Sequence, residues 1–465
     1  MLKSLASLFQ GLRPDRRRMY EGAAGGRRWS AGVDMPSTNA AILASRGPLS
    51  RRARYFEGNN PLAASGVGVW ESALVGAGIT PMSAHPDSSV RETLQRHWET
   101  WTDYADADEM SDFYGIQRVM ARRMVIDGEA FAVLVTTPEG FRIRLIDAEQ
   151  VDTALHRELP GGGRIVAGVE FNAAGRRVAY HILRERSGLP LATSLDTVRL
   201  DARDVIHLFK PVTPGQVRGL SWFVSILLRL SEHDQSIDAQ LVRQKIAALL
   251  TGFIRDPNGT AGGFSGTTAP TDALDVSLEP GTLKVLGPGQ DITFSDPAKV
   301  GSEVIDFLKV SAREIAAGLG VPYEAITGDL SDVNYSSIRA GLVEFRRRVE
   351  AIQHQVIVFQ ACRPIWRRFV MTEILAGRVQ APDFFRNPEP YLLARWMPPK
   401  TDWVDPKNDV EAELAAIAGG LVSRRKAVAA RGYDVEEIDR EIADDQRREG
   451  ELGLDFTQKP SGVAA

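Results

Sequence analysis

Three long stretches of helical periodicity in the second half of the chain constrain its fold more than any other feature. They cover residues 221–250, 298–319 and 337–376. In the third stretch, apolar residues recur at alternating spacings of four and three, which predicts a packing stripe against another helix. Pro364 interrupts this stretch and should kink the helix or begin a second one. The stripe consists of Ile338, Leu342, Phe345, Val349, Ile352, Val356, Phe359, Trp366 and Val370.

A polar loop at Gly318–Gly341 joins the second and third stretches. Pro322 is predicted to end one helix, and Gly328 to turn the chain. Ser336 or Ser337 is predicted to cap the helix that follows. A loop with this many turn and cap signals, but no catalytic side chains, is typical of a segment that holds or contacts something.

The first half reads as helices followed by strands. Residues 88–126 have helical periodicity, and residues 128–210 form a β-rich unit. Two hairpins are expected there, with turns at Pro138–Gly140 and Asn172–Gly175. One further strand is expected in residues 198–210. The sequence therefore predicts an α+β protein in which long helices accompany a separate β unit.

The remaining segments are separated by composition. Residues 251–297, between the first two long helices, are rich in glycine and threonine and contain two short strand-like pieces. Residues 401–450 read as short acidic helices, and the tail at 451–465 as disordered. Residues 1–45 lack sustained periodicity and are interpreted as a loosely ordered arm.

Charge is distributed unevenly along the chain. The net charge is −4, but residues 1–60 carry +7 and the rest therefore −11. A basic arm on an acidic body fits either nucleic-acid binding or a solvated terminus. No apolar run approaches the ~20 residues that span a bilayer, and the N-terminus does not have the order of charge and apolar core found in signal peptides. These features predict a cytoplasmic protein without a membrane segment.

No catalytic motif stands out. The chain has no phosphate-binding loop of the Walker type, no dinucleotide fingerprint and no helical histidine pair for a metal. His207 reads as a core or edge histidine. The single cysteine, Cys362, excludes an internal disulfide and lies in an apolar helical stretch, which favours a buried inert thiol. The sequence thus predicts no enzyme, no cofactor and no metal.

A series of short runs carries a family resemblance. Each run is weak alone, but together they keep one order over residues 20–340. They are Tyr20–Ala23, Arg27–Trp29, Arg51–Arg54, Asn59–Pro61, Val75–Ile79, Asp127–Phe131, Asp204–His207, Pro214–Ser221, Gly320–Glu324, Gly328–Asp329 and Asn334–Ser337. In this order they resemble the lambda-like family of portal proteins of tailed bacteriophages.

The resemblance implies a subunit with a β-rich wing, two long stem helices flanking a small clip, a long wing helix and a helical C-terminal crown. The implied boundaries are 1–45 (basic arm), 46–220 (wing), 221–250 (first stem helix), 251–297 (clip), 298–320 (second stem helix), 321–337 (tunnel loop), 338–400 (long wing helix and following segment), 401–450 (crown) and 451–465 (tail).

The resemblance also implies partners and place. The chain would form a homo-dodecameric ring that passes double-stranded DNA without sequence preference. It would bind the large terminase subunit, head-completion or adaptor proteins, and capsid and scaffolding proteins. It would reside at the portal vertex of the virion, and in the host cytoplasm during assembly.

Candidate DNA-contacting residues follow from this layout. In the tunnel loop they are Asp329, Ser331, Asp332, Asn334 and Tyr335, and in the stem they are Arg229, Arg243, Lys245, Lys299, Lys309 and Arg313. Independently of this layout, the basic arm, which could bind nucleic acid or an acidic partner surface, contains Arg16, Arg17, Arg18, Arg27 and Arg28. Two alternatives remain open at this point: Tyr335 packs beneath the loop while Asn334 makes a turn, or both side chains face DNA.

Two other functions compete with a conduit. A DNA-binding regulator would use the basic arm, but it leaves the unit of two helices and an insert unexplained. A hydrolase would need a site built from residues distant in the sequence, which a single sequence does not reveal.

Overall fold

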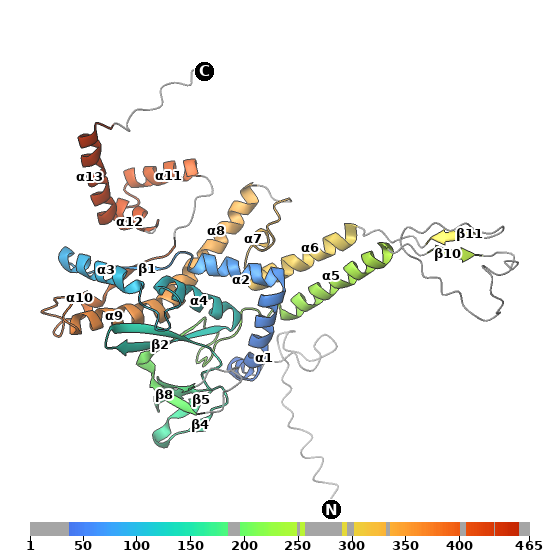
Figure 1. Cartoon of the computed structure of the whole chain (residues 1–465), viewed down its shortest axis with the longest axis horizontal. Helices are drawn as coiled ribbons and strands as arrows, with labels where there is room; N and C mark the ends of the chain where they lie inside the picture. The colour runs from blue at the N-terminus through green and yellow to red at the C-terminus, as the bar shows by residue number, and fades with distance from the viewer. Residues whose placement is uncertain are drawn as a thin grey trace, which may run out of the picture.

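The computed structural model describes residues 37–184, 196–248, 252–255, 291–294, 302–331, 335–399, 406–431 and 433–454. Figure 1 shows a body of helices packed over β-sheets, from which two long helices project to one side. The α+β class predicted from the sequence is confirmed. Among the described residues, no helix has both the length and the apolar character needed to cross a membrane.

Four helices form the N-terminal part of the body, and side chains of the preceding residues cap each of them. Ser37, Asn60, Asp87 and Asp112 accept a hydrogen bond from a first-turn N–H, as favoured N-cap residues do. The first helix begins eight residues before the wing boundary expected at 46. The helices are α1 (Thr38–Asn59), α2 (Pro61–Leu74), α3 (Ser88–Thr102) and α4 (Phe113–Ile126).

An aromatic cluster forms the centre of the body. Trp98 of α3 lies with its ring centroid 4.8 to 5.2 Å from those of Trp101, Phe113, Trp366 and Phe369. Four of these five side chains are at most 1% exposed, and Trp101 is 9% exposed. Aromatic pairs at this separation contribute attraction beyond their buried area, so the cluster joins the N-terminal helices to the long C-terminal helix.

Two antiparallel sheets make up the β-rich unit. The three-stranded sheet has the order β3-β2-β9 and the five-stranded sheet β4-β5-β6-β7-β8. Both predicted hairpins are confirmed: β2 and β3 pair around the turn before Gly140, and β6 and β7 around Asn172–Gly175. The strands are β2 (Glu129–Thr137), β3 (Gly140–Ile146), β4 (Arg157–Glu158), β5 (Arg164–Val166), β6 (Val169–Phe171), β7 (Arg177–Leu183), β8 (Thr197–Asp201) and β9 (Val205–Phe209).

The strand predicted across 198–210 is wrong, because this stretch contains two strands of different sheets. Between β8 and β9 lies a short 3-10 turn, η3 (Ala202–Asp204). The Asp201 side chain accepts from the N–H of Arg203 at 2.9 Å, which stabilises the turn locally. The turn carries the chain from the five-stranded sheet to the three-stranded one.

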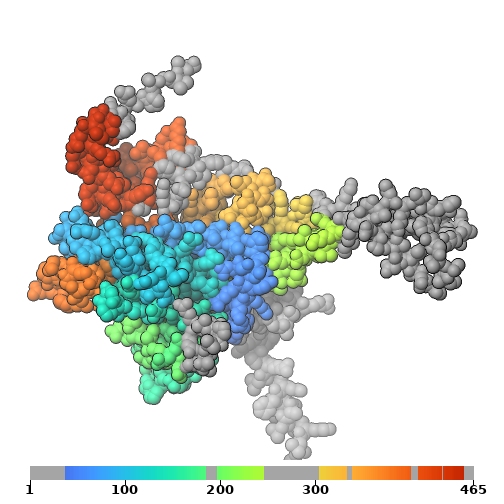
Figure 2. Space-filling model, in the orientation of Figure 1, coloured from blue at the N-terminus to red at the C-terminus, as the bar shows by residue number. Residues whose placement is uncertain are grey.

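Two long antiparallel helices form the projection, which we call the stem. They are α5 (Leu227–Ala248) and α6 (Ser302–Leu319), with strands β10 (Gly252–Arg255) and β11 (Asp291–Phe294) paired antiparallel at the far end. Figure 2 shows α5 in green projecting beyond the blue N-terminal helices, with α6 in yellow running outward from the body. The first helix starts at Leu227 rather than at 221, because 222–226 form turns whose Phe223 and Ile226 are buried in the body.

A second helical path runs from the stem back across the body. It comprises α7 (Tyr323–Thr327), α8 (Tyr335–Ile352), the π-helical segment η4 (Gln353–Cys362) and α9 (Arg363–Leu375). The N–H of Arg363 bonds to Val358 O, five residues back. Since Pro364 has no N–H, a change of hydrogen-bond register just before it accommodates the missing donor. Pro364 does start a new helix, as one of the two sequence interpretations held.

Two of the predicted boundaries near α7 need correction. Pro322 precedes α7 as its N-cap, and α6 is instead ended by Gly320, whose φ is +80°. Ser336 and Ser337 lie inside the first turn of α8 and do not cap it, since this helix begins at Tyr335. Gly328 turns the chain as predicted, with φ +69° at the end of α7.

The C-terminal part contains short helices and one strand. Strand β12 (Ala394–Met397) pairs antiparallel with β1 (Thr80–Ser83), so it joins the body. Short helices were predicted across 401–450, and the described residues contain three. They are α11 (Pro406–Ala418), α12 (Arg424–Ala429) and α13 (Val435–Leu452), preceded by α10 (Glu389–Leu392) in the body.

Candidate functional site

A fully buried carboxylate lies where the helices, the sheets and the root of the stem meet. Glu129, the first residue of β2, is 0% exposed. Arg218 donates to it from Nη2 at 2.6 Å, and the N–H of Gly219 donates at 2.6 Å. Arg46 of α1 also donates to it, and Nε2 of His207 lies 3.0 Å away. We call these five residues the buried ion cluster.

The residues around Glu129 keep its carboxylate ionised. Burial alone would raise the pKa of Glu129, but Arg218 and Arg46 lower it well below its usual value, so the carboxylate is ionised. Arg218 is itself 0% exposed. Its remaining donors reach the carbonyls of Ala148 at 2.9 Å and Ala167 at 2.7 Å. The cluster therefore ties together α1, two strands and the segment that leads into the stem.

His207 in this cluster makes the fold sensitive to acid. Burial lowers the pKa of His207 to about 4, against 6.5 in an exposed histidine, although Glu129 opposes the shift. Between these pH values the unfolded chain binds a proton that the folded chain does not, so stability falls as the pH falls.

Acidification from pH 7.5 to about 4 is expected to cost about 3 kcal/mol of stability through His207 alone. The depressed pKa of Glu129 adds a loss below about pH 4.5. Chemical denaturation midpoints measured across this range test the slope. The variant His207→Gln should flatten it, whereas His354→Gln, at an exposed position on η4, should not. An unchanged slope in His207→Gln would contradict the assignment.

The root of the stem is fixed to the body by aromatic side chains. Trp70 of α2 donates from Nε1 to Leu319 O at 3.1 Å, at the end of α6. Its ring lies edge-on to Trp222 at 4.9 Å and tilted to Phe345 at 5.1 Å. Through these contacts one buried indole joins the root ends of both stem helices to α8.

Polar contacts hold the two stem helices together near the root. Ser225 Oγ donates to Gly318 O at 3.2 Å, and His233 Nδ1 lies 3.2 Å from Ser311 Oγ. Burial lowers the pKa of His233, which favours the neutral imidazole in this contact. These contacts define the antiparallel register of the pair. Ser225 lies opposite Gly318, and His233, eight residues later, lies opposite Ser311, seven residues earlier.

The basic side chains predicted in the stem do not form one stripe. Arg229 is paired with Glu232 at 3.2 Å and with Glu314 at 3.5 Å. Arg243 and Lys245 are exposed near the far end of α5. The structure therefore separates Arg229, near the root, from the two cations near the tip.

Two other predicted stem cations face the loop beyond α6. Lys309 Nζ lies 3.9 Å from Asp329, and the guanidinium of Arg313 lies 5.2 Å over the ring of Tyr323. Ser331 donates from Oγ to Asp329 at 2.6 Å. The hydrogen bonds that Asp329 accepts from the hydroxyl and the N–H of Ser331 lower its pKa, and the charge of Lys309 lowers it further. Asp329 thus orders the loop and fastens it to the stem.

Several predicted site residues are not placed. Tyr335 is the first residue of α8, but its side chain is outside the part that the structure describes. The other predicted site residues outside the described ranges are Arg16, Arg17, Arg18, Arg27, Arg28, Lys299, Asp332 and Asn334.

Sequence reasoning missed the buried ion cluster and the contact between Lys309 and Asp329. A signal for the cluster exists, because Glu129 and Arg218 are charged residues inside the runs Asp127–Phe131 and Pro214–Ser221. A charged residue at the start of an otherwise apolar strand is rarely buried without a partner. The contact with Asp329 has no comparable signal, since its partners are joined only by the turn at Gly328.

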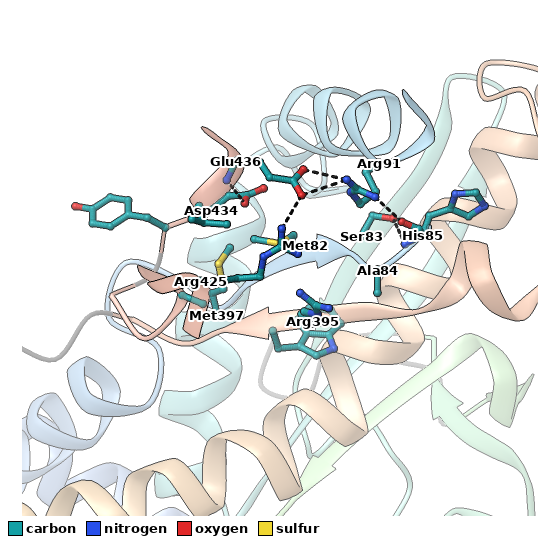
Figure 3. Close-up of a pocket in the computed structure, with 14 residues that line it drawn as sticks. Met82, Ser83, Ala84, His85, Arg91, Arg395, Met397, Arg425, Asp434 and Glu436 are labelled. Atoms are coloured by element: carbon teal, nitrogen blue, oxygen red, sulfur yellow. Dashed lines mark hydrogen bonds and ion pairs between the residues drawn. The ribbon is translucent and has the colours of Figure 1, made fainter. Parts of the chain in front are cut away.

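A cleft separates the body from the C-terminal helices (Figure 3). Glu436 of α13 accepts from Arg91 of α3 at 3.0 Å and from Arg425 of α12 at 3.1 Å, and Arg91 also donates to His85 O at 2.9 Å. The adjoining cavity holds about 270 Å³ and is lined partly by Met82. Arg91 lowers the pKa of Glu436, which keeps the ion pair charged. Ser83 and His85 also line this cavity, where the backbone N–H of His85 donates to Ser83 Oγ at 3.4 Å and the His85 ring accepts from the N–H of Asp87 at 3.1 Å.

The described residues also offer little for catalysis elsewhere. They contain no group of three or more His, Cys, Asp and Glu side chains placed to hold a metal ion. Burial raises the pKa of Cys362 to about 12, so its thiol is protonated and unreactive at neutral pH, as the sequence indicated.

Comparisons with known proteins agree on one family. Residues 25–353 match the family described as phage portal protein, lambda family. The chain is 24% identical over 446 residues to a probable portal protein of Halomonas phage phiHAP-1, with 92% of this chain and 85% of the relative covered. It is 22% identical over 470 residues to portal protein B of Escherichia phage lambda, with 89% and 86% covered.

A solved structure agrees at the level of the fold. The neck of an empty GTA particle, computed with C6 symmetry, contains a chain that aligns with a TM-score of 0.50 at 15% identity, over 83% of this chain and 93% of that one. None of these matches supports a regulator or a hydrolase. Because the family match covers most of the sequence, the chain belongs to the lambda family of phage portal proteins, structural components of the virion at the capsid vertex and neck.

Proposed function

We propose that this chain assembles with copies of itself into a closed dodecameric ring of roughly 610 kDa, from subunits of 51.0 kDa, through which double-stranded DNA enters and leaves the capsid. The stem is the observation that carries the proposal. It is a two-helix projection that exposes large apolar side chains, among them Leu228 (71%), Phe307 (61%) and Val310 (52%). Apolar surface of this kind on a projecting element is typical of an interface.

The charges of the stem suit a channel wall along which DNA slides. Each phosphate that a protein neutralises adds to a salt-dependent affinity, so a continuous basic stripe would hold the duplex in place. In the described part of the stem, Arg229 is paired with Glu314 and Lys309 lies near Asp329. Paired cations present little net positive charge to passing DNA.

The loop after α6 is the segment that we assign to the channel. Asp329 and Ser331 form an ordered turn fastened to α6, and both residues belong to the loop predicted to enter the tunnel. The next residues, Asp332, Asn334 and Tyr335, are proposed to contact DNA through hydrogen bonds and apolar contact.

The distal end of the stem is proposed to bind the packaging and completion proteins. The β10–β11 ladder lies at this end, within the clip expected at 251–297. The large terminase subunit would dock there during packaging in the host cytoplasm, and head-completion or adaptor proteins would follow. Capsid and scaffolding proteins would contact the wing.

Electron microscopy and native mass spectrometry of the purified chain test the ring. The expected result is closed rings with a single dominant subunit number and a central opening wide enough for duplex DNA. Monomers and small oligomers as the only species, under all assembly conditions tried, would overturn the proposal.

A truncation tests the basic arm separately. Since α1 begins at Thr38, removing residues 1–36 leaves every described element in place. Ring formation is expected to survive this truncation. Loss of DNA binding, together with the absence of rings in the full chain, would instead favour the regulator.

A further inference from the structure

Both stem helices carry large apolar side chains that are exposed within the described part of the chain. On α5 and the turn before it, Val224, Leu228 and Val242 recur at helical spacing and are 44%, 71% and 54% exposed. On α6, Phe307 and Val310 lie three residues apart and are 61% and 52% exposed. By helical spacing, Leu228 and Val242 lie on the far side of α5 from His233 and Gln240, which face α6. Phe307 lines the open groove between the two helices and stays largely exposed there, with Val310 beside it.

The far end of the stem is charged, with opposite signs on the two helices. Arg243 and Lys245 are exposed near the end of α5, and Glu303 and Asp306 are exposed at the start of α6. Because the helices are antiparallel, these four residues lie at the same end of the stem. Within the described residues, none of the four forms an ion pair or hydrogen bond with another group.

The register of the pair places the opposite charges at nearly the same height. The contacts between Ser225 and Gly318 and between His233 and Ser311 fix that register. Extended along the helices, it puts Glu303 level with Leu241, about one helical turn of 5.4 Å from Lys245. If the stem runs along the ring axis, a rotation about that axis preserves this level, and Glu303 of one subunit meets the cationic end of α5 in the next.

We propose that the face of α5 that carries Val224, Leu228 and Val242 in one copy packs over the exposed Phe307 and Val310 of α6 in the adjacent copy. Arg243 and Lys245 then pair with the acidic start of α6. The contact is heterologous, as a ring requires. This inference rests on the proposed ring, and it moves Arg243 and Lys245 from the channel wall to the contact between subunits.

A simpler role for the same charges must be separated from this one. An acid in the first turn of a helix and a cation in the last turn each stabilise that helix through its dipole, typically by 0.3–1 kcal/mol. Glu303 and Lys245 occupy such positions. Reversing either charge would then weaken the stem, whether or not subunits meet there. Asp238 is also exposed and lies level with Asp306, so both acids of α6 are reversed together below.

Two complementary variants distinguish the roles. One carries Arg243→Glu with Lys245→Glu, and the other carries Glu303→Lys with Asp306→Lys. Alone, each places like charges across every contact between copies, and ring yield should fall at least about tenfold, equivalent to 1.4 kcal/mol. Mixed in equal amounts, they restore opposite charges at every contact between unlike subunits, so rings in which the two variants alternate should form again.

Native mass spectrometry of the mixture gives the decisive reading. Rings with equal numbers of the two variants support the proposal. If neither variant alone reduces ring yield, or if the mixture fails to restore it while both variants keep the thermal stability of the unmodified chain, the proposal is overturned. Dipole effects alone predict two destabilised variants and no rescue on mixing, which also overturns it.

A matched control guards against a general effect of charge. The variant Arg157→Glu with Arg176→Glu makes the same change in charge at exposed positions of the five-stranded sheet, and its ring yield should equal that of the unmodified chain. Failure of this interface and failure of the proposed function give different results. If the unmodified chain forms no ring, the proposed function fails, whereas rings that tolerate both charge reversals refute only this interface.

Discussion

Replacing Glu129 with glutamine is expected to destabilise the body by about 3–5 kcal/mol, the cost of breaking a buried ion pair by removing one partner. Glutamine has nearly the shape of glutamate, so little packing is lost. Arg218, however, is 0% exposed, and Arg46 is 6% exposed. Both guanidinium groups would keep their charge without a carboxylate to balance it, and no solvent reaches them to compensate.

The fluorescence of the buried tryptophans reports this loss. Trp98 lies at the centre of the aromatic cluster, so a thermal scan should show its transition about 3–5 °C lower in Glu129→Gln. The matched control is Glu389→Gln, because Glu389 is 63% exposed and lies 3.8 Å from Arg367. Surface pairs contribute about 0–1 kcal/mol. Equal shifts in the two variants would contradict the role assigned to the cluster.

Replacing Gly128 with alanine is expected to cost at least about 3 kcal/mol, because it combines backbone strain with a clash. Gly128 has φ +85°, a conformation that disfavours any side chain. A Cβ there would also overlap the backbone of Leu220 and Ser221, which has no freedom to move away as a side chain would. These two residues begin the segment that leads into the stem.

A substitution at a second glycine separates the cost of backbone strain from the cost of the steric clash. Gly175, in the turn between β6 and β7, has φ +74°, and a Cβ there meets nothing within 4 Å. Gly175→Ala should therefore show the strain alone, about 1–2 kcal/mol. Soluble yield and thermal stability of the two variants measure the difference. A Gly128→Ala chain as stable as Gly175→Ala would show that the two segments have room to separate.

Local features of the sequence predicted local structure well. Both hairpins were identified because their turn residues stand between alternating apolar residues, and Pro364 marked a helix start because it lacks an N–H. Predictions became wrong where packing overrides periodicity. The segment before Leu227 continues the helical pattern of α5, but Phe223 and Ile226 are drawn into the core and leave the backbone in turns.

The candidate site was less accessible to sequence reasoning. Glu129 meets Arg46, His207 and Arg218, which are 83, 78 and 89 residues away, so no window of sequence contains the cluster. The stem cations were identified as residues, but their roles depend on neighbours. Lys309 lies by Asp329, while Lys245 has no ionic partner among the described residues of the same chain. Only the fold separates these two roles.

The buried ion cluster also sets the angle at which the stem leaves the body, and this angle would affect the geometry of the proposed ring. Gly219 binds Glu129 directly, and α5 begins eight residues later. The helix has 22 residues, so at 1.5 Å per residue a rotation of about 3° at its root moves its far end by about 1.7 Å. In the proposed ring, cyclic symmetry would repeat that displacement in every subunit with the same sense, so it would not average out. A mild substitution in the cluster should therefore change the bore of the ring before it reduces the amount of folded protein.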